Sequence, residues 1–208
     1  MSDIRVAAPH GLTTIGWLVS AALAIAALAH AYTVVLSLRG PEEHAGTVVA
    51  EGTSFGFATS TADGIGSTVL TSARVLVLAL FIVWLYLARD NFDRRGGGAE
   101  WSKGWTIGGW FVPIANLGIP NRVVADVHRR SAPDRSEPTD RLVNAWWAAL
   151  LVSFIGHTET TTYADGTVVV HTPAFFGVVA GGAGILAAIL GVLLVRRVSA
   201  WQDATPAA

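Results

Sequence analysis

Three side chains near residue 160 have the chemistry of zinc ligands. His157, Glu159 and His171 flank an Ala-Asp-Gly turn signal, so a β-hairpin over residues 157–173 would bring them close together. Protein-bound zinc is usually four-coordinate, and the sequence offers no evident fourth ligand. We therefore expect no metal site, and the alternative is a zinc site formed by His157, Glu159 and His171. The chain has no cysteine, which excludes disulfides, thiolate nucleophiles and thiolate metal sites.

Three further polar residues interrupt long apolar runs, where an ionisable side chain is a candidate functional group. His30 could be proton-sensitive or contact a ligand, but we favour a neutral ring bonded to a neighbouring helix. Arg74 could bind an ion, but we favour extension of its long side chain to the outer interface. Asn144 is interpreted as a helix–helix hydrogen-bonding residue.

The motifs of common enzymes are missing from the sequence. It contains no His-Glu-x-x-His, no Gly-x-Ser-x-Gly, no phosphate-binding loop and no dinucleotide-binding fingerprint. No pair of carboxylates lies inside an apolar segment. We expect a protein that is not an enzyme, has no cofactor and binds no nucleic acid.

Composition and the distribution of charge predict an all-α integral membrane protein. Hydrophobic residues make up 52% of the 208 residues and charged residues only 14%, against about 25% charged in soluble proteins. A membrane-spanning helix needs about 20 mostly apolar residues. Four segments approach or exceed this length, and we predict them as transmembrane helices: residues 15–38, 69–88, 139–156 and 174–195.

The basic residues predict the orientation of these spans, because short cytoplasmic loops are enriched in Lys and Arg. All fourteen Lys and Arg residues except Arg39 and Arg74 fall in segments that can share one side of the membrane. The cytoplasmic segments are then residues 1–14, 89–104, 132–138 and 196–208, and the outer loops are residues 39–68 and 157–173. We expect a bacterial plasma membrane protein with both termini in the cytoplasm.

This orientation requires that residues 105–120 do not cross the membrane, although they are nearly free of charge. Pro113 and Pro120 each remove a backbone donor and interrupt a helix. We predict a re-entrant, interfacial element over residues 105–131 on the cytoplasmic side. The Asn116 side chain is expected to satisfy backbone groups that the prolines leave free.

Small residues and basic loops predict how the protein associates. Gly177, Gly181 and Gly184 form a close-packing stripe in the last span, which could contact the first span or a second copy in a homo-oligomer. Clusters of Arg next to a membrane attract anionic lipid. We therefore expect membrane lipids, anionic ones in particular, as partners; the sequence indicates no particular protein partner.

One stretch of the sequence carries a family resemblance. Residues 89–133, from RDNFDRR to HRRSAP, resemble the core of the domain of unknown function 4328 family, whose members are uncharacterised bacterial membrane proteins. The matching positions, which are our structural or functional candidates, are Arg89, Asn91, Trp105, Trp110, Phe111, Pro113, Asn116, Pro120 and Ser131. The chain departs from the pattern at His128, where an aromatic residue, usually Trp, is expected. The resemblance implies a multi-pass membrane protein and supplies no activity.

Two functions remain open on the sequence. The first is a non-enzymatic membrane scaffold or regulator, favoured by the missing catalytic groups. The second is a small transporter or channel that uses the broken element as its site, because transporters build sites from interrupted helices.

Overall fold

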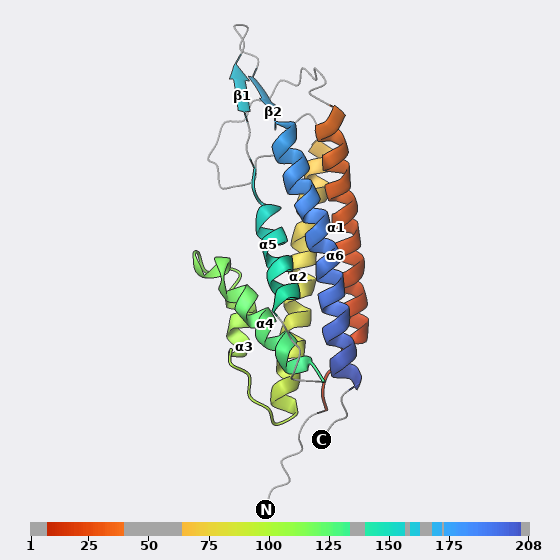
Figure 1. Cartoon of the computed structure of the whole chain (residues 1–208), viewed down its shortest axis with the longest axis vertical. Coiled ribbons are helices and arrows are strands. Elements are labelled where there is room, and N and C mark those ends of the chain that lie inside the picture. The colour runs from red at the N-terminus through yellow and green to blue at the C-terminus, as the bar shows by residue number, and fades with distance from the viewer. Residues whose placement is uncertain are drawn as a thin grey trace, which may run out of the picture.

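The protein is a bundle of long helices with a helical hairpin attached to one end (Figure 1). The computed structural model describes residues 8–39, 64–133, 140–156, 159–162, 168–171 and 173–204. In chain order the elements are α1 (Thr13–Arg39), α2 (Gly64–Arg94), α3 (Lys103–Gly108), the 3-10 turn η2 (Ala115–Leu117), α4 (Ile119–Ser131), α5 (Arg141–Val152), β1 (Glu159–Thr162), β2 (Val168–His171) and α6 (Ala174–Ala204).

Three helices are long and apolar enough to cross a membrane: α1, α2 from Thr71 onward, and α6. Helices α1 and α6 have 27 and 31 residues, which at 1.5 Å per residue is about 40 and 46 Å. Large apolar side chains point outward from them, as Leu28 does with 71% of its surface exposed. The predicted spans 15–38, 69–88 and 174–195 each lie within one of these helices.

The remaining predicted span, residues 139–156, is not a full-length helix. Helix α5 has 12 residues, about 18 Å, where about 30 Å of hydrocarbon has to be crossed. The apolar run continues into Phe154 and Ile155, but the helix has already ended at Val152. Hydropathy alone does not separate a short helix from a span when apolar residues follow it. In the part of the chain that the structure describes, three of the four predicted transmembrane helices have spanning length, and the fourth stays a prediction.

Helices α1 and α6 pack closely through the glycine stripe. A Cβ atom at Gly177, Gly181 or Gly184 would collide with Ser37, Val34 or His30 of α1, respectively. As the residue number increases along α6, the number of the contacted residue on α1 decreases, so the two helices are antiparallel. The predicted contact between the first and last spans therefore forms within one chain. A homo-oligomer through the same glycines stays a prediction.

An aromatic core fills the half of the bundle nearest the hairpin. Phe81 stacks on Trp146 with ring centroids 5.2 Å apart and meets Trp110 edge-on at 5.9 Å. Trp84 is fully buried and donates its indole N–H to Ser199 Oγ at 3.0 Å. These rings bind α2, α5, α6 and the hairpin into one body.

The strands β1 and β2 pair as an antiparallel ribbon near the start of α6 (Figure 1). Within the predicted outer hairpin, Glu159 lies opposite His171 in the register. Residues 40–63, which make up most of the first predicted outer loop, lie outside the described residues.

Candidate functional site

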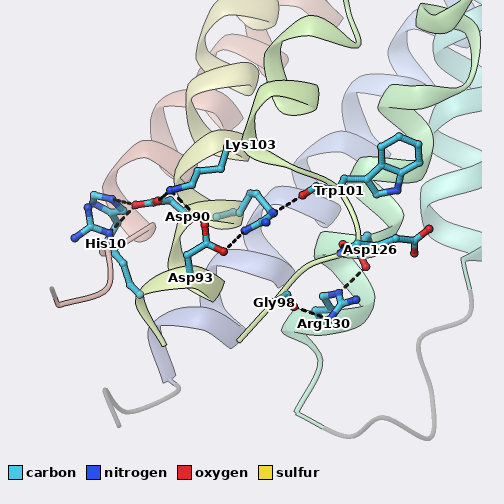
Figure 2. A network of polar contacts seen from close by, with 12 residues as sticks. His10, Asp90, Asp93, Gly98, Trp101, Lys103, Asp126 and Arg130 are labelled. Atoms are coloured by element: carbon cyan, nitrogen blue, oxygen red, sulfur yellow. Dashed lines mark hydrogen bonds and ion pairs between the residues drawn. The ribbon is translucent and has the colours of Figure 1, made fainter. Parts of the chain in front are cut away.

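Polar side chains gather at the end of the bundle where α1 begins and α2 and α6 end (Figure 2). They come from the segment before α1, the last turns of α2 and α6, the loop after α2, and α4. We call this group the polar network: His10, Ala88 through its carbonyl, Arg89, Asp90, Asn91, Asp93, Arg94, Lys103, Asp126, Arg130, Ser131 and Gln202.

Asp90 is the centre of the charged part of the polar network. Its carboxylate accepts hydrogen bonds from Arg94 Nε at 2.6 Å and from Lys103 Nζ, and His10 Nε2 lies 3.0 Å from it. Lys103 also contacts Asp93 at 3.3 Å. These hydrogen bonds, the one to Asp90 first, raise the pKa of Lys103 above its ordinary value. The cluster thereby holds the start of α3 and the chain before α1 against the end of α2.

Arg89 is a buried guanidinium whose contacts are made inside the chain. It donates from Nε to the Trp101 carbonyl and from NH1 to Asp93, both at 2.7 Å. A buried charge without partners would be strongly destabilising, so Arg89 can be buried only because it makes these two hydrogen bonds. They fix the loop between α2 and α3 beneath the bundle.

Asn91 and Gln202 form the uncharged part of the polar network, and both are almost completely buried. The Asn91 amide accepts the His10 backbone N–H at 2.6 Å and donates to the His10 carbonyl and to Gln202 Oε1, both at 2.9 Å. Gln202 donates to the Ala88 carbonyl at 3.1 Å and to Ser131 Oγ at 2.9 Å. Four segments distant in sequence are therefore joined through two amides.

Asp126 joins α4 to the glycine turn after α2. It is 3% exposed and accepts the Arg130 Nε–H at 2.6 Å and the Glu100 backbone N–H at 3.1 Å. Arg130 also donates to the Gly98 carbonyl at 2.7 Å. Gly96 has φ of +71°, a conformation that favours glycine, so the triple glycine has a structural use in this turn. A cavity of about 600 Å³ lies here, lined by Phe92, Gly97, Gly98, Glu100, Asp126, Arg129 and Arg130.

The predicted re-entrant element is a helical hairpin of α3, η2 and α4 whose tip is apolar and exposed. Phe111, Ile114 and Leu117 expose 67%, 85% and 60% of their surface. Their position along the bundle can be followed in Figure 1, where the tip lies beside the bundle and well above the end that carries the polar network. An exposed apolar patch of this kind marks contact with a partner or with lipid.

The prediction for Asn116 is wrong. Its side chain is exposed and makes no hydrogen bond within the part of the chain that the structure describes. Most backbone donors of the tip are satisfied by tight turns instead: Val112 donates to Gly108 and Asn116 donates to Val112. Leu117 and Gly118 likewise donate to carbonyls three residues earlier. The amide side chain of Asn116 is therefore not used as a cap.

The other hairpin positions that the sequence singled out divide into anchors and exposed groups. Trp110 packs edge-on against Phe81 and Trp147, and Trp147 Nε1 donates to the Leu117 carbonyl at 3.1 Å. Pro120 is buried at the start of α4. Phe111, Pro113 and, at 37%, Trp105 are exposed. The anchors hold the hairpin to α5 and α2 while its tip stays uncovered.

The three polar residues that interrupt the apolar runs contact neighbouring helices or segments. His30 is buried, and its ring fills the space above Gly184. Arg74 donates to the Ser153 carbonyl at 3.2 Å and lies over the Phe154 ring, so it satisfies the end of α5. Its extension to the outer interface stays a prediction. Asn144 accepts a hydrogen bond from Asn121 at 3.1 Å, which joins α5 to α4 as predicted.

No metal site is evident in the described residues. They contain no group of three His, Cys, Asp or Glu side chains that could hold an ion. Glu159 and His171 are register partners, while His157 lies outside the described residues.

Sequence reasoning missed the residues that complete the polar network, above all Gln202, Asp90 and His10. Asp203 was also missed: its carboxylate accepts the backbone N–H groups of Leu12 at 2.8 Å and Thr13 at 2.9 Å, at the start of α1. The available signal was a Gln-Asp pair shortly after Arg196 and Arg197, which end the last long apolar run. That signal shows the end of a helix but not its partners.

Long apolar helices joined by a buried polar network at one end indicate a helical membrane protein. The chain belongs to the family described as Domain of unknown function (DUF4328), whose model matches residues 57–200, more than half of the 208-residue chain. The family match includes α2, the hairpin and most of α6. No curated protein and no solved structure matches the chain.

Proposed function

We propose that the protein is a non-enzymatic scaffold or regulator in the plasma membrane of a bacterium, with both termini in the cytoplasm. The observation that carries this proposal is the closure of the polar network. Asn91, Gln202, Arg89 and Asp126 are buried, and each is hydrogen-bonded within the chain. Polar groups that bind a substrate are usually left open to it, whereas these are used to hold the helices in one arrangement.

The proposed membrane arrangement has four crossings. Helices α1, α2 and α6 cross as full helices, and the chain crosses a fourth time through α5 and the residues that follow it. This is supported by the direction of α5, which begins near the hairpin end and precedes a strand pair near the opposite end of the bundle (Figure 1). The β1–β2 ribbon is then an outer cap, and the polar network lies at the cytoplasmic surface.

The α3–α4 hairpin is proposed to enter the membrane from the cytoplasmic side and to return to it. Its exposed tip presents the apolar side chains of Phe111, Ile114 and Leu117, and most of its backbone donors are paired within the hairpin. Both properties suit the hydrocarbon region, where unpaired backbone groups are very costly. The inserted hairpin beside a rigid bundle offers a surface for a membrane partner.

A transporter is less well supported by the packing. The α1–α6 contact is closed by glycines, and Leu23, Trp84 and Leu194 fill the space inside the bundle. Arg74 and His30, the two ionisable groups that interrupt the apolar spans, contact Ser153 and Gly184 rather than an open path. This alternative predicts a flux, and the scaffold predicts none.

Reconstitution in liposomes tests the proposal. Vesicles containing the protein should be no more permeable to protons, K⁺ or Cl⁻ than protein-free vesicles, with vesicles containing a known channel as the positive control. A saturable flux that Arg74→Gln or His30→Gln abolishes would overturn the scaffold proposal in favour of the transporter.

A further inference from the structure

A small groove lies between the beginning of α1 and the last turns of α6, on the opposite side of α6 from α4. Its volume is about 90 Å³, and its lining consists of Thr13, Gly16, Trp17, Arg196, Ser199 and Ala200. The floor is closed, because a Cβ atom at Gly16 would lie 2.9 Å from Ser199 Oγ. Ser199 accepts a hydrogen bond from Trp84, and the Thr13 hydroxyl is bonded to Asp203. Ser199 is also buried, so the exposed groups that remain to contact a ligand are Trp17 and Arg196.

Trp17 and Arg196 form a stacked pair at the mouth of the groove. The Arg196 guanidinium carbon lies 3.8 Å from the centroid of the Trp17 ring, and Trp17 is 56% exposed. Among the described residues, Arg196 has no carboxylate within ion-pair distance and the Trp17 indole N–H has no acceptor. Stacking on an aromatic face orients a guanidinium while its N–H groups stay available for an anion.

An apolar strip continues from this pair toward the middle of the bundle. On α6, Leu186, Ile189 and Leu193 are each about half exposed. Spacings of three and four residues place them on the same helix face as Arg196. On α1, Ala21 and Ala24 follow Trp17 at helical spacing on the same face, and both are small and exposed. The strip is therefore an exposed apolar surface that ends at a cationic group.

We propose that this groove binds an anionic phospholipid. The phosphate accepts hydrogen bonds from Arg196 and from the Trp17 indole, and an acyl chain lies along the strip of Leu193 and Ile189. A free phosphate ion would use the Arg196 end and gain nothing from the apolar strip, so the combination of the two favours a lipid. Trp and Arg are also the residue types that anchor helices at a membrane interface.

This inference rests on the membrane placement proposed above but not on the scaffold role. A protein that transported ions would still be expected to hold the lipid, and a scaffold without this lipid would still show no flux. The two proposals can therefore fail separately.

The test uses the full chain purified in detergent, with bound lipid counted by native mass spectrometry. Dioleoyl-phosphatidylglycerol is the anionic lipid, dioleoyl-phosphatidylcholine is the neutral comparison, and inorganic phosphate is the free anion. The variant Arg196→Gln removes the proposed ligand. The matched control is Arg197→Gln, which removes the same charge one residue away, where the guanidinium stacks on Trp201 instead.

Arg196→Gln should lower the affinity for one phosphatidylglycerol about five-fold, the factor expected for one cationic side chain at an anionic membrane surface. Arg197→Gln should change it less than two-fold. Trp17→Leu should also weaken binding, and it serves if Arg196→Gln does not yield folded protein. Equal losses in the two Arg variants, or no loss in either Arg196→Gln or Trp17→Leu, would overturn the site. Complete displacement of phosphatidylglycerol by millimolar inorganic phosphate would show that the groove binds the free ion and not a lipid.

Discussion

The buried amide of Asn91 gives the sharpest prediction about stability. Asn91 is 0% exposed and has three hydrogen bonds, to the His10 N–H, the His10 carbonyl and Gln202 Oε1. Leu has the same branched arrangement of side-chain heavy atoms but cannot hydrogen-bond, so Asn91→Leu leaves these partners without it. Each buried partner left unsatisfied costs about 1–3 kcal/mol. Some of them can relax or meet water, so we expect a total loss of about 2–4 kcal/mol.

The measurement is thermal unfolding in detergent, followed by tryptophan fluorescence. For a chain of this size a loss of 2–4 kcal/mol corresponds to a fall in melting temperature of about 4–16 °C. Amide hydrogen exchange at His10 should also become faster, because its N–H loses its acceptor. This second reading locates the effect at the polar network.

Asn116→Leu is the matched control, because it makes the same chemical change at an exposed amide without a hydrogen bond in the described structure. Its melting temperature should stay within about 2 °C of the parent, the range of surface substitutions. The reasoning is refuted if Asn91→Leu melts like the parent protein, or if Asn116→Leu loses as much stability as Asn91→Leu.

Three further predictions concern pH and helix packing. His128 is 2% exposed, and its pKa is lowered mainly by burial and in addition by the nearby positive charge of Arg197. The folded protein therefore holds the imidazole neutral. Its stability should decrease as pH falls below about 6.5, the pKa of a histidine in the unfolded chain. His128→Phe should reduce the difference in melting temperature between pH 7.5 and pH 5.5, and an unchanged difference would contradict this assignment. Gly184→Val should lower the free energy of unfolding by about 1–3 kcal/mol, because a Cβ there would lie 2.5 Å from the buried His30 imidazole. The control Gly182→Val should lower it much less, because a Cβ at that position meets nothing within 4 Å. Asp203→Ala should destabilise the start of α1 by about 1 kcal/mol, seen as faster amide exchange there, and unchanged exchange would show that this carboxylate is not an effective cap.

The long helices could be predicted from the sequence because their signal is local. Uncharged runs of about 20 residues admit few other interpretations, and the basic residues mark where they end. The same reasoning overestimated the length of α5, because Phe154 and Ile155 extend the apolar run beyond the helix end at Val152. Hydropathy reports the surroundings of a residue, whereas the helix end depends on backbone hydrogen bonds.

The polar network could be predicted only in part. The family resemblance singled out Arg89, Asn91 and Ser131, and all three are buried in the polar network. Gln202 was not found, because it is 111 residues from Asn91 in the chain and no local pattern connects them. Asn116 was assigned a capping role from its position between two prolines, but tight turns already satisfy the donors around it. Local sequence rules therefore located the interrupted segment correctly but assigned the Asn116 side chain a role that it does not have.

The central claim is that the α3–α4 hairpin enters and leaves the membrane on the cytoplasmic side. The chain has no cysteine, so single cysteines can be introduced at Ser102 and Arg141, which flank the hairpin, and at Thr161 in the β1 strand. A membrane-impermeant maleimide should label only Thr161→Cys in intact cells, while Ser102→Cys and Arg141→Cys should react only after the membrane is opened. Labelling of Arg141→Cys but not Ser102→Cys in intact cells would show that the hairpin segment crosses the membrane, and would contradict the claim.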